Sequence, residues 1–467
     1  MLNVFKRLNN LIQRDNHLKK IILYSFYVSV ISFAILLFFA KSNNLNLGTI
    51  TGDSRVYIRM AENIAYRGIF SNSASAPYVE ESFRSPGYSF FMAVLISIFR
   101  NWDLALLVQA LIVFISPVIF YLIFRDFNEK VAYISSLVFI FEPTKIFLSN
   151  IFLSDAIFLV FFLLSIFLFL RWSKSFYLRP LMFSGLILGI STLVRTIAQF
   201  LPFVFIVFII IFSWKKRSFK AIFRDVIVFF LMFFAVIAPW MFRNYIVFGE
   251  FSIASLGKFN VAYYNAIGYL KQVHGNDSNE VNAAMKILQT DPGIYGVRSL
   301  QNLNRFNQIT KDVISNNPLG YAKFHLIKTI PFFFSDGIRD VARYLKIISD
   351  TPPNISGGIF SGDFSKIIKF IKNSGPDFFL FITGAFFWGL VFVLSLVNFS
   401  YLLSKKSINK TFISFFIILI IYFAVLTGPV SNARYRFPVS AFLIFFGVNG
   451  VFIVTLKIKN RLTRKLD

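Results

Sequence analysis

Long apolar segments recur along the whole chain, and they restrict its fold more than any other feature. Residues 21–40 form the first, and several later ones approach the ~20 residues that a helix needs to cross a bilayer. Of the 467 residues, 56% are hydrophobic and 19% aromatic, which exceeds the usual content of a soluble domain. Because every backbone polar group in lipid needs a partner within the protein, runs of this length fold as helices. The sequence therefore predicts an all-α membrane protein, a polytopic helical bundle.

The apolar runs predict about ten transmembrane helices. The first run has no small-residue cleavage site after it, so we expect it to be retained as a span. The chain has no cysteine, which excludes a disulfide framework and a thiolate metal site. The expected helices cover residues 21–40, 104–124, 131–147, 151–170, 181–197, 199–213, 225–242, 377–403, 411–427 and 437–456.

The net charge of +26 comes from short basic blocks between the apolar runs. Such blocks determine membrane topology, so we expect no nucleic-acid partner. With the N-terminus inside, every short basic block falls on the cytoplasmic side. The sequence thus predicts a multi-pass protein of the cytoplasmic membrane with both termini in the cytoplasm. The blocks contain Lys6, Arg7, Arg14, Lys19 and Lys20, then Arg125 and Lys130, Arg171, Lys174 and Arg179, Lys215, Lys216, Arg217, Lys220 and Arg224, Lys405, Lys406 and Lys410, and finally Lys457, Lys459, Arg461, Arg464 and Lys465.

This topology divides the chain into four regions and leaves two long segments outside. Residues 54–68 and 88–99 of the first outer segment predict two short helices at the membrane interface. The second outer segment is too long for a bare connector and predicts a small helical extramembrane region. The regions are a cytoplasmic N-terminus (1–20), an N-terminal transmembrane catalytic module (21–242, with an outer loop at 41–103), an extracytoplasmic region (243–376), and C-terminal helices with a basic tail (377–467).

Charged side chains gather at the outer ends of the expected helices, where such groups are costly and often functional. Each also has a simpler interpretation. Asp53 and Asp155 could cap the helices that begin beside them, Arg195 could snorkel to the surface, and Glu142 could mark a helix end. The set is Asp53, Arg84, Glu142, Asp155, Arg195, Arg243, Arg434 and Arg436, of which the last two could be ordinary loop cations.

Carboxylates facing several arginines suit a donor that carries phosphate. The planar guanidinium fork binds phosphate oxygens through charge-assisted hydrogen bonds. A carboxylate near an acceptor hydroxyl can act as a general base, or two carboxylates could hold Mg²⁺ or Mn²⁺, which prefer oxygen ligands. Since an apolar bundle offers a groove for a lipid chain, the sequence predicts a lipid-phosphate donor with its head group at the outer surface.

Several ordered segments resemble the GT-C-type glycosyltransferases, the group that includes bacterial relatives of dolichyl-phosphate-mannose protein mannosyltransferases and the aminoarabinose transferases. The segments are GDSRVYIRMAENIAYRGIF, RSPGYSFFMAVL, LSDAIFLVFFLLSIFLFL, GLILGISTLVRTIAQFLPFVF, APWMFRNYIVFGEFSIASLG and RYRFP. The resemblance implies a polyprenyl-phosphate-linked sugar donor, a GT-C-like bundle and transfer at the outer face of the membrane.

The resemblance also implies roles for individual residues. Asp53 takes the catalytic or metal-linked position of the first outer loop, and Asp155 takes the second acidic position. Ser54 stands where protein mannosyltransferases carry Glu, which disfavours protein mannosylation and leaves a glycan, a lipid or a protein as the acceptor. The resemblance places Arg84, Arg195 or Arg243 at the donor phosphate and Glu142 near the second acidic position. We also expect Tyr88, Arg434 and Arg436 among the substrate-binding residues.

Two other classes of protein compete with the enzyme hypothesis. A transporter or lipid flippase is expected to show inverted repeats and helices broken at the bilayer midplane, and the sequence shows neither clearly. A structural membrane protein without catalysis would leave Asp53, Asp155, Arg84 and Arg243 far apart. The enzyme hypothesis requires them to converge.

Overall fold

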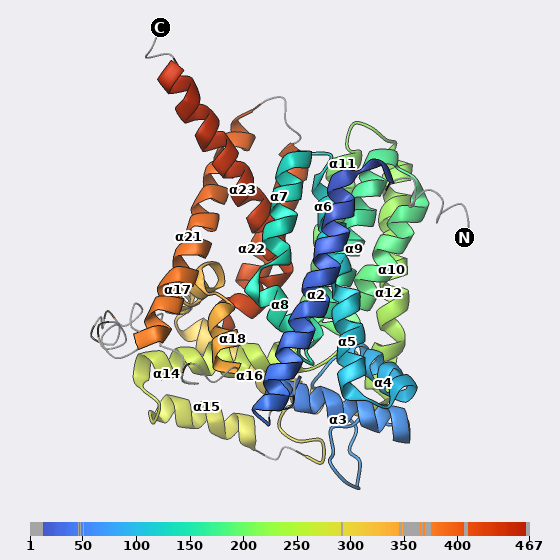
Figure 1. Ribbon diagram of the computed structural model, residues 1–467. Helices are drawn as coiled ribbons and strands as arrows, with labels where there is room; N and C mark the ends of the chain where they lie inside the picture. The colour runs from blue at the N-terminus through green and yellow to red at the C-terminus, as the bar shows by residue number, and fades with distance from the viewer. Residues whose placement is uncertain are drawn as a thin grey trace.

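The predicted all-α fold is confirmed. The computed structural model describes residues 13–44, 51–290, 293–344, 375–405 and 410–463, with a few single positions between these ranges. Helices make up the regular structure of these residues, apart from one isolated bridge between Ser71 and Glu80. Most of the helices run side by side as one bundle (Figure 1).

Eight helices in the described part of the chain are long and apolar enough to cross a membrane, or nine if a bent pair counts as one span. The expected number of about ten is therefore not confirmed, although each expected segment is helical. The eight are α2 (Asn16–Ser42), α5 with α6 (Trp102–Val113 and Ile115–Phe124), α9 (Ser154–Ser175), η1 with α11 (Thr196–Ala198 and Leu201–Ser213), α12 (Phe219–Phe248), α21 (Gly375–Ser404), α22 with η4 (Lys410–Thr427 and Gly428–Val430) and α23 (Ala433–Thr463).

The two remaining segments differ from simple spans. The bent pair is α7 (Glu129–Ile140) and α8 (Pro143–Ser149), which meet at 55°. Glu142 between them has the extended backbone (φ −65°, ψ 122°) that a following proline favours. The last segment, α10 (Leu178–Val194), has 17 residues and is shorter than the other spans.

Shorter helices lie at one end of the bundle, which we call the site end. There α3 (Gly52–Arg67) lies across the lower ends of the spans in Figure 1, and α4 (Gly87–Phe99) lies beside it. The beginning of α2 and the end of α23 lie at the opposite, upper end. The segment after α12 adds α13 (Leu256–Asn260), η2 (Val261–Ile267), α14 (Gly268–His274), α15 (Asn279–Gln289), η3 (Leu300–Asn302), α16 (Leu303–Asn316), α17 (Pro318–Phe334) and α18 (Ile338–Tyr344).

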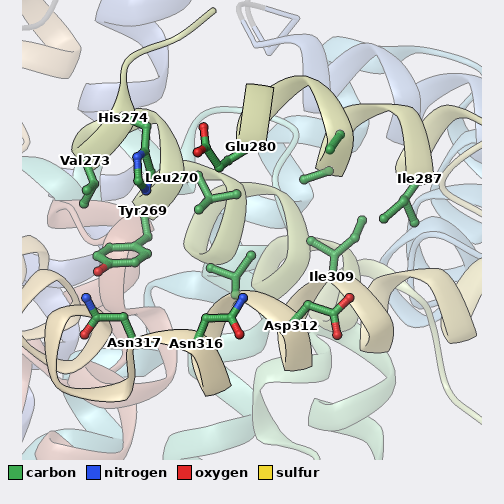
Figure 2. A pocket seen from close by; sticks show the side chains of 13 residues that line it. Tyr269, Leu270, Val273, His274, Glu280, Ile287, Ile309, Asp312, Asn316 and Asn317 are labelled. Atoms are coloured by element: carbon green, nitrogen blue, oxygen red, sulfur yellow. The ribbon is translucent and has the colours of Figure 1, made fainter. Parts of the chain in front are cut away.

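The described residues pack around two hydrophobic cores. The larger core fills the bundle and is rich in phenylalanine. The smaller core belongs to the segment after α12, with Phe259, Phe306 and Phe324 among its members, and Phe83 reaches it from the segment between α3 and α4. The helices α14, α15 and α16 also enclose a pocket, shown in Figure 2. A helical unit with its own core, which the sequence predicts to be extramembrane, thus covers part of the site end.

Candidate active site

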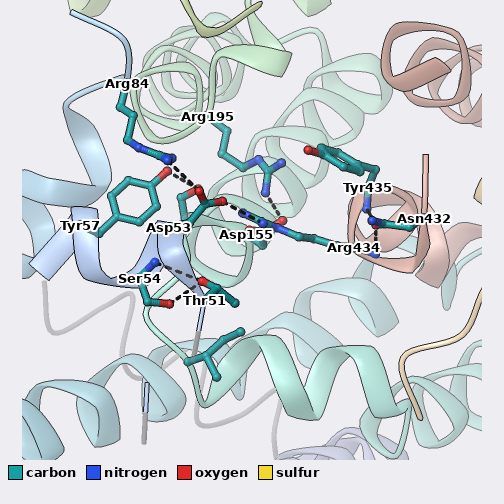
Figure 3. A network of polar contacts seen from close by, with 12 residues as sticks. Thr51, Asp53, Ser54, Tyr57, Arg84, Asp155, Arg195, Asn432, Arg434 and Tyr435 are labelled. Carbon is teal, nitrogen blue, oxygen red and sulfur yellow. Dashed lines mark hydrogen bonds and ion pairs between the residues drawn. The ribbon is translucent and has the colours of Figure 1, made fainter. Parts of the chain in front are cut away.

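Five charged side chains from five separate segments meet at the site end of the bundle (Figure 3). Asp53 lies in the first turn of α3, and Asp155 lies in the first turn of α9. Arg84 precedes α4, Arg195 follows the last residue of α10, and Arg434 lies in the first turn of α23. The fold therefore assembles one cluster from positions spread over most of the chain.

Each of the four carboxylate oxygens in this cluster contacts a guanidinium group. Arg84 Nη2 lies 2.7 Å from Asp53 Oδ1, and Arg434 Nη1 lies 3.0 Å from Asp53 Oδ2. The Nε of Arg434 lies 3.0 Å from Asp155 Oδ2, so this one side chain joins the two carboxylates. Arg195 pairs with the other oxygen of Asp155. Three positive and two negative groups leave the cluster with one net positive charge.

The two carboxylates differ in their access to solvent. The side chain of Asp155 is fully buried, whereas that of Asp53 keeps 36% of its surface exposed. An uncompensated buried charge is strongly destabilising, so Asp155 depends on Arg195 and Arg434. Asp53 is the carboxylate that a substrate can reach.

The arginines control the ionisation of Asp53. Burial raises the pKa of this carboxyl, but the charges and hydrogen bonds of Arg84 and Arg434 outweigh burial and lower the pKa to about 2. Asp53 is consequently ionised at every physiological pH. A carboxylate with so low a pKa is a weak base as long as both arginines hold it.

Asp53 lies in the first turn of α3 but is not the N-cap of this helix. Thr51 is the N-cap, and its side chain accepts a hydrogen bond from the Ser54 amide at 3.1 Å. The interpretation of Asp53 as a cap is therefore wrong. Asp155 does not cap α9 either, since the N-cap position is Leu153. Both carboxylates still lie in first turns, where the helix dipole favours negative charge.

The Pro86-Gly87 turn fixes the position of Arg84. A Cβ on Gly87 would lie 2.7 Å from the carbonyl carbon of Leu193 at the end of α10, so only glycine allows this approach. Arg84 also lies over the ring of Tyr57, with its Cζ 4.9 Å from the centroid. These contacts hold the guanidinium against Asp53 although Arg84 is on an irregular segment.

Two tyrosines support the cluster from within the protein. The hydroxyl of Tyr57 donates to Ser154 Oγ at 3.3 Å, and the hydroxyl of Tyr88 donates to Gln109 Oε1 at 2.6 Å. Burial raises the pKa of Tyr57, but Arg84 and the hydrogen bond to Ser154 outweigh it, so the pKa lies below the ordinary value. Tyr88 was expected at the site and lies behind it.

The sequence analysis missed Tyr57, although a signal for it was present. Tyr57 follows Asp53 by four residues on the same helix, and residues at this spacing share a helix face. Tyr435 was also missed, and its ring lies 5.8 Å from the Cζ of Arg195.

Glu142 and Arg436 lie in a second polar group and have no hydrogen bond or ion pair to the cluster. Glu142 is the N-cap of α8, and it accepts from the Lys145 amide at 2.7 Å and from the Thr144 hydroxyl at 2.6 Å. The contacts of Glu142 therefore agree with the simpler interpretation, in which this residue marks the end of a helix. Fully buried Arg436 donates to two carbonyl oxygens at the end of α17, 2.7 Å and 2.6 Å away.

Arg243 contacts the segment between α3 and α4 rather than the cluster. It pairs with Glu80 and donates to the Glu81 carbonyl at 3.1 Å. Among the four residues chosen to test convergence, Asp53, Asp155 and Arg84 therefore come together, and Arg243 lies apart.

The cluster does not fit a divalent cation as it stands. Within the described residues, no three His, Cys, Asp or Glu side chains form a group that could hold a metal. All four oxygens of Asp53 and Asp155 already contact guanidinium groups. A cation between the carboxylates would have to displace Arg434 and would face the charges of Arg84 and Arg195.

The chain shares its fold with solved oligosaccharyltransferases, in agreement with the GT-C-like bundle that the sequence resemblance implies. Two solved structures share it: the archaeal oligosaccharyltransferase AglB from Archaeoglobus fulgidus in complex with an inhibitory peptide and a dolichol-phosphate, and the apo form of an oligosaccharyltransferase from the same organism. The first has a TM-score of 0.54 at 13% identity over 97% of this chain, and the second has a TM-score of 0.51 at 15% identity over 95%.

Part of the chain also matches the model of a protein family. Residues 83–242 match the family described as dolichyl-phosphate-mannose-protein mannosyltransferase. This stretch contains Arg84, Asp155 and Arg195 of the cluster. No curated protein matches the sequence. The chain spans about half the length of the solved proteins, covering 52% and 51% of them.

Proposed function

We propose that the protein transfers a sugar from a polyprenyl-phosphate-linked donor to a glycan, lipid or other acceptor at the outer face of the cytoplasmic membrane. The observation that carries this proposal is the cluster of three arginines on two carboxylates. Its net charge of +1 complements the single negative charge of a phosphodiester such as a sugar–phosphate–polyprenyl lipid. Guanidinium groups bind phosphate oxygens in a bidentate geometry, and their positions here are fixed before any donor arrives.

In this proposal the donor phosphate exchanges places with Asp53. Arg84 and Arg434 each hold one oxygen of Asp53, the exposed carboxylate. A phosphate that takes these guanidinium contacts frees Asp53, whose basicity then rises. The donor thus creates the base that the reaction needs. Asp155 remains buried and paired with Arg195. Its contact with Nε of Arg434 keeps that bridging side chain in place.

The transfer step follows from this exchange. Asp53 takes the proton of the acceptor hydroxyl, and the acceptor oxygen forms a bond to the anomeric carbon through an oxocarbenium-like transition state. The bond between that carbon and the phosphate oxygen breaks, and its electron pair leaves with polyprenyl phosphate. Arg84 and Arg434 stabilise the leaving group because they are already oriented toward it. The arginines supply the charge stabilisation, so the proposed step needs no resident divalent cation.

The orientation of the site is part of the proposal. The cluster lies at the end of the bundle opposite the beginning of α2 and the end of α23 (Figure 1). Since the basic blocks favour cytoplasmic termini, this end faces the outside. Protein mannosylation is disfavoured because Ser54, where protein mannosyltransferases carry Glu, is committed to the cap of α3, with its hydroxyl 2.8 Å from Thr51 Oγ1.

The test supplies the purified chain in lipid with defined polyprenyl-phosphate sugars and a mixture of membrane acceptors. Mass spectrometry then identifies which acceptor gains the mass of one sugar. We expect release of polyprenyl phosphate and less than a twofold effect of a metal chelator. Failure to consume any common lipid-linked sugar would contradict the proposal, and movement of an unchanged lipid across the bilayer would favour a flippase.

A further inference from the structure

A pocket separate from the carboxylate–arginine cluster lies in the extramembrane unit. The helices α14, α15 and α16 enclose an open pocket of about 390 Å³ (Figure 2), which is within the size range of small-ligand sites. The unit joins the site end of the bundle, since η2 packs on η4, just before α23 and Arg434. A ligand in this pocket would lie on the same side of the membrane as the cluster.

The pocket has an apolar wall and a polar rim. Ala284, Ile287 and Val313 belong to the wall. At the rim, Asp312 and Asn316 project from α16 (Figure 2), and they form no hydrogen bond or ion pair with any residue that the structure describes. Their polar atoms are therefore open to a ligand.

Tyr269 adds a phenol group to the polar side chains of the pocket. Its side chain is 3% exposed and lines the pocket. Its hydroxyl lies on the side of Asn317 in Figure 2 and makes no hydrogen bond within the described part of the chain. The hydroxyl oxygen itself is reached by solvent, so a ligand with hydroxyl groups can replace water as its partner.

The charges of the pocket decide between classes of ligand. Two carboxylates, Glu280 and Asp312, and the imidazole of His274 line it. The carboxylates outnumber the imidazole, so the pocket repels phosphates and acidic sugars. The pocket is therefore not a second donor-phosphate site. Carboxylate, amide and phenol groups together provide donors and acceptors for hydroxyl groups, and the apolar wall suits the C–H face of a pyranose ring.

We propose that this pocket binds neutral saccharide units of the acceptor and serves as an acceptor subsite separate from the transfer site. The acceptor role rests on the proposed sugar transfer, whereas binding of a saccharide does not. A subsite of this kind selects acceptors by sugars that do not react themselves. The extramembrane unit then sets specificity, and the cluster performs the transfer.

The direct test is saturation-transfer NMR on the full chain in detergent micelles. The probes are maltotriose and chitotriose, with trigalacturonate as an anionic comparator and a neutral Ser-Gly-Ala peptide as an alternative ligand. We expect signal transfer to at least one neutral trisaccharide and none to trigalacturonate. Absence of binding by both neutral trisaccharides, equal binding of the anionic one, or binding of the peptide alone would overturn the proposal.

Two matched variants localise the binding. Ala283→Phe fills the pocket from an exposed position on α15 and is expected to weaken trisaccharide binding at least tenfold. Asn282→Phe makes the same change at the neighbouring exposed position, which does not line the pocket, and is expected to keep the dissociation constant within twofold. Asp312→Asn is a second pocket variant that adds no volume and is expected to weaken binding several-fold. Unchanged binding by Ala283→Phe would place the saccharide elsewhere and contradict the assignment.

The two proposals fail in different experiments. Saccharide binding needs no donor and is expected to survive in Asp53→Asn, so it remains measurable if the chain transfers no sugar. If transfer occurs, Ala283→Phe is expected to raise the KM for the acceptor at least tenfold with little change in kcat. Transfer with an unchanged acceptor KM in this variant would contradict the acceptor subsite, whereas the proposed sugar transfer would stand.

Discussion

Among the described residues, two fully buried aspartates each face two arginines, and they lie toward opposite ends of the bundle. Asp155 begins α9 and contacts Arg195 and Arg434. Asp225, in α12, contacts Arg217 and Arg224 and accepts a hydrogen bond at 3.1 Å from Trp172, near the other end of α9. Residue type, burial and charge partners are thus nearly the same at the two sites.

The two sites differ in what else their arginines contact. Arg434 also holds the exposed Asp53, and Asp53 in turn shares Arg84. At the other end, Arg217 lies over the ring of Phe176 and no second carboxylate joins Asp225 in the described residues. Loss of an arginine contact by the exposed Asp53 would therefore leave no buried charge unpaired, whereas loss of the arginine contacts at Asp225 would.

The largest effect is expected from Asp53→Asn. The change removes the proposed base and one of the charges that the arginines hold, so transfer is expected to fall by at least about 10³-fold, the range typical of a lost general base. Transfer is measured with a lipid-linked sugar, and thermal unfolding in detergent is expected to show only the modest loss of the ion pairs of Asp53. The matched control is Asp103→Asn, an exposed acid paired with Lys41, which is expected to keep activity within twofold. Full activity of Asp53→Asn would remove the catalytic assignment.

Asp225→Asn tests the other half of the comparison. Loss of the charged partner of Arg217 and Arg224 is expected to destabilise the fold by about 2–3 kcal/mol, as for a buried hydrogen bond to a charged group. Thermal unfolding measures this loss, and the remaining folded protein is expected to transfer sugar at the parent rate. A loss of activity per folded molecule would mean that the Asp225 site also has a role in transfer.

Even the conservative substitution Arg434→Lys is expected to lower the rate of transfer strongly. Arg434→Lys keeps the charge, but the ammonium lacks the planar geometry in which Nε and Nη1 each hold a different carboxylate. Transfer is expected to fall about 10²-fold, comparable to the loss of one preorganised donor. Steady-state kinetics with varied donor provide the measurement. A parent-like rate in Arg434→Lys would show that the bridge is not needed.

The helical bundle was predictable because the length of an apolar run and the basic residues beside it can be read within a short stretch of sequence. The arrangement at the beginning of α23 was not. The expected helix began at residue 437, which left Arg434 and Arg436 in one loop, but α23 begins at Ala433. Side chains two positions apart on a helix point about 200° away from each other. Arg434 therefore reaches the cluster, whereas Arg436 reaches the end of α17. The helix boundary alone decides this difference.

The pairing within the cluster could not be predicted either. Arg434 lies 381 positions from Asp53 and 279 from Asp155. No local pattern connects residues at such separations. The resemblance to a family named most members of the cluster, but it also included Arg243, whose contacts are local to the loop at Glu80 and Glu81. Only the packing of the helices separates the two groups of arginines.

The pH dependence of transfer tests the proposed exchange at Asp53. In the free chain the pKa is about 2, below the ordinary value of a carboxyl. The profile of kcat/KM, which reports the free chain, is therefore expected to show no acidic limb from Asp53 above about pH 3. If the donor phosphate takes Arg84 and Arg434, the pKa of Asp53 rises in the complex, and the acidic limb of kcat moves to higher pH. Superimposable limbs in the two profiles would argue against the exchange.

The same pKa predicts a smaller effect on stability. Because the folded pKa of Asp53 is lowered, its pairing stabilises the fold fully above the unfolded value of about 3.9, and the contribution is lost as pH falls toward 2. Thermal unfolding of the parent chain and of Asp53→Asn should differ by a constant amount above pH 5. The two curves should converge between pH 4 and pH 2, and a difference that does not change with pH would mean that Asp53 is not held by the arginines.

The smallest effect is expected at Arg243, although the sequence placed it with the donor-binding arginines. Its guanidinium pairs with Glu80 and donates to the Glu81 carbonyl and to Asn244 Oδ1, with no contact to Asp53 or Asp155. Arg243→Gln is expected to lower transfer less than about threefold, with an unchanged KM for the donor, because a partly exposed ion pair contributes little. Donor-dependence kinetics compare it directly with Arg434→Lys. A tenfold rise in the donor KM for Arg243→Gln would mean that the loop at Glu80 moves to bring Arg243 to the donor, and the boundary of the site would then have to include it.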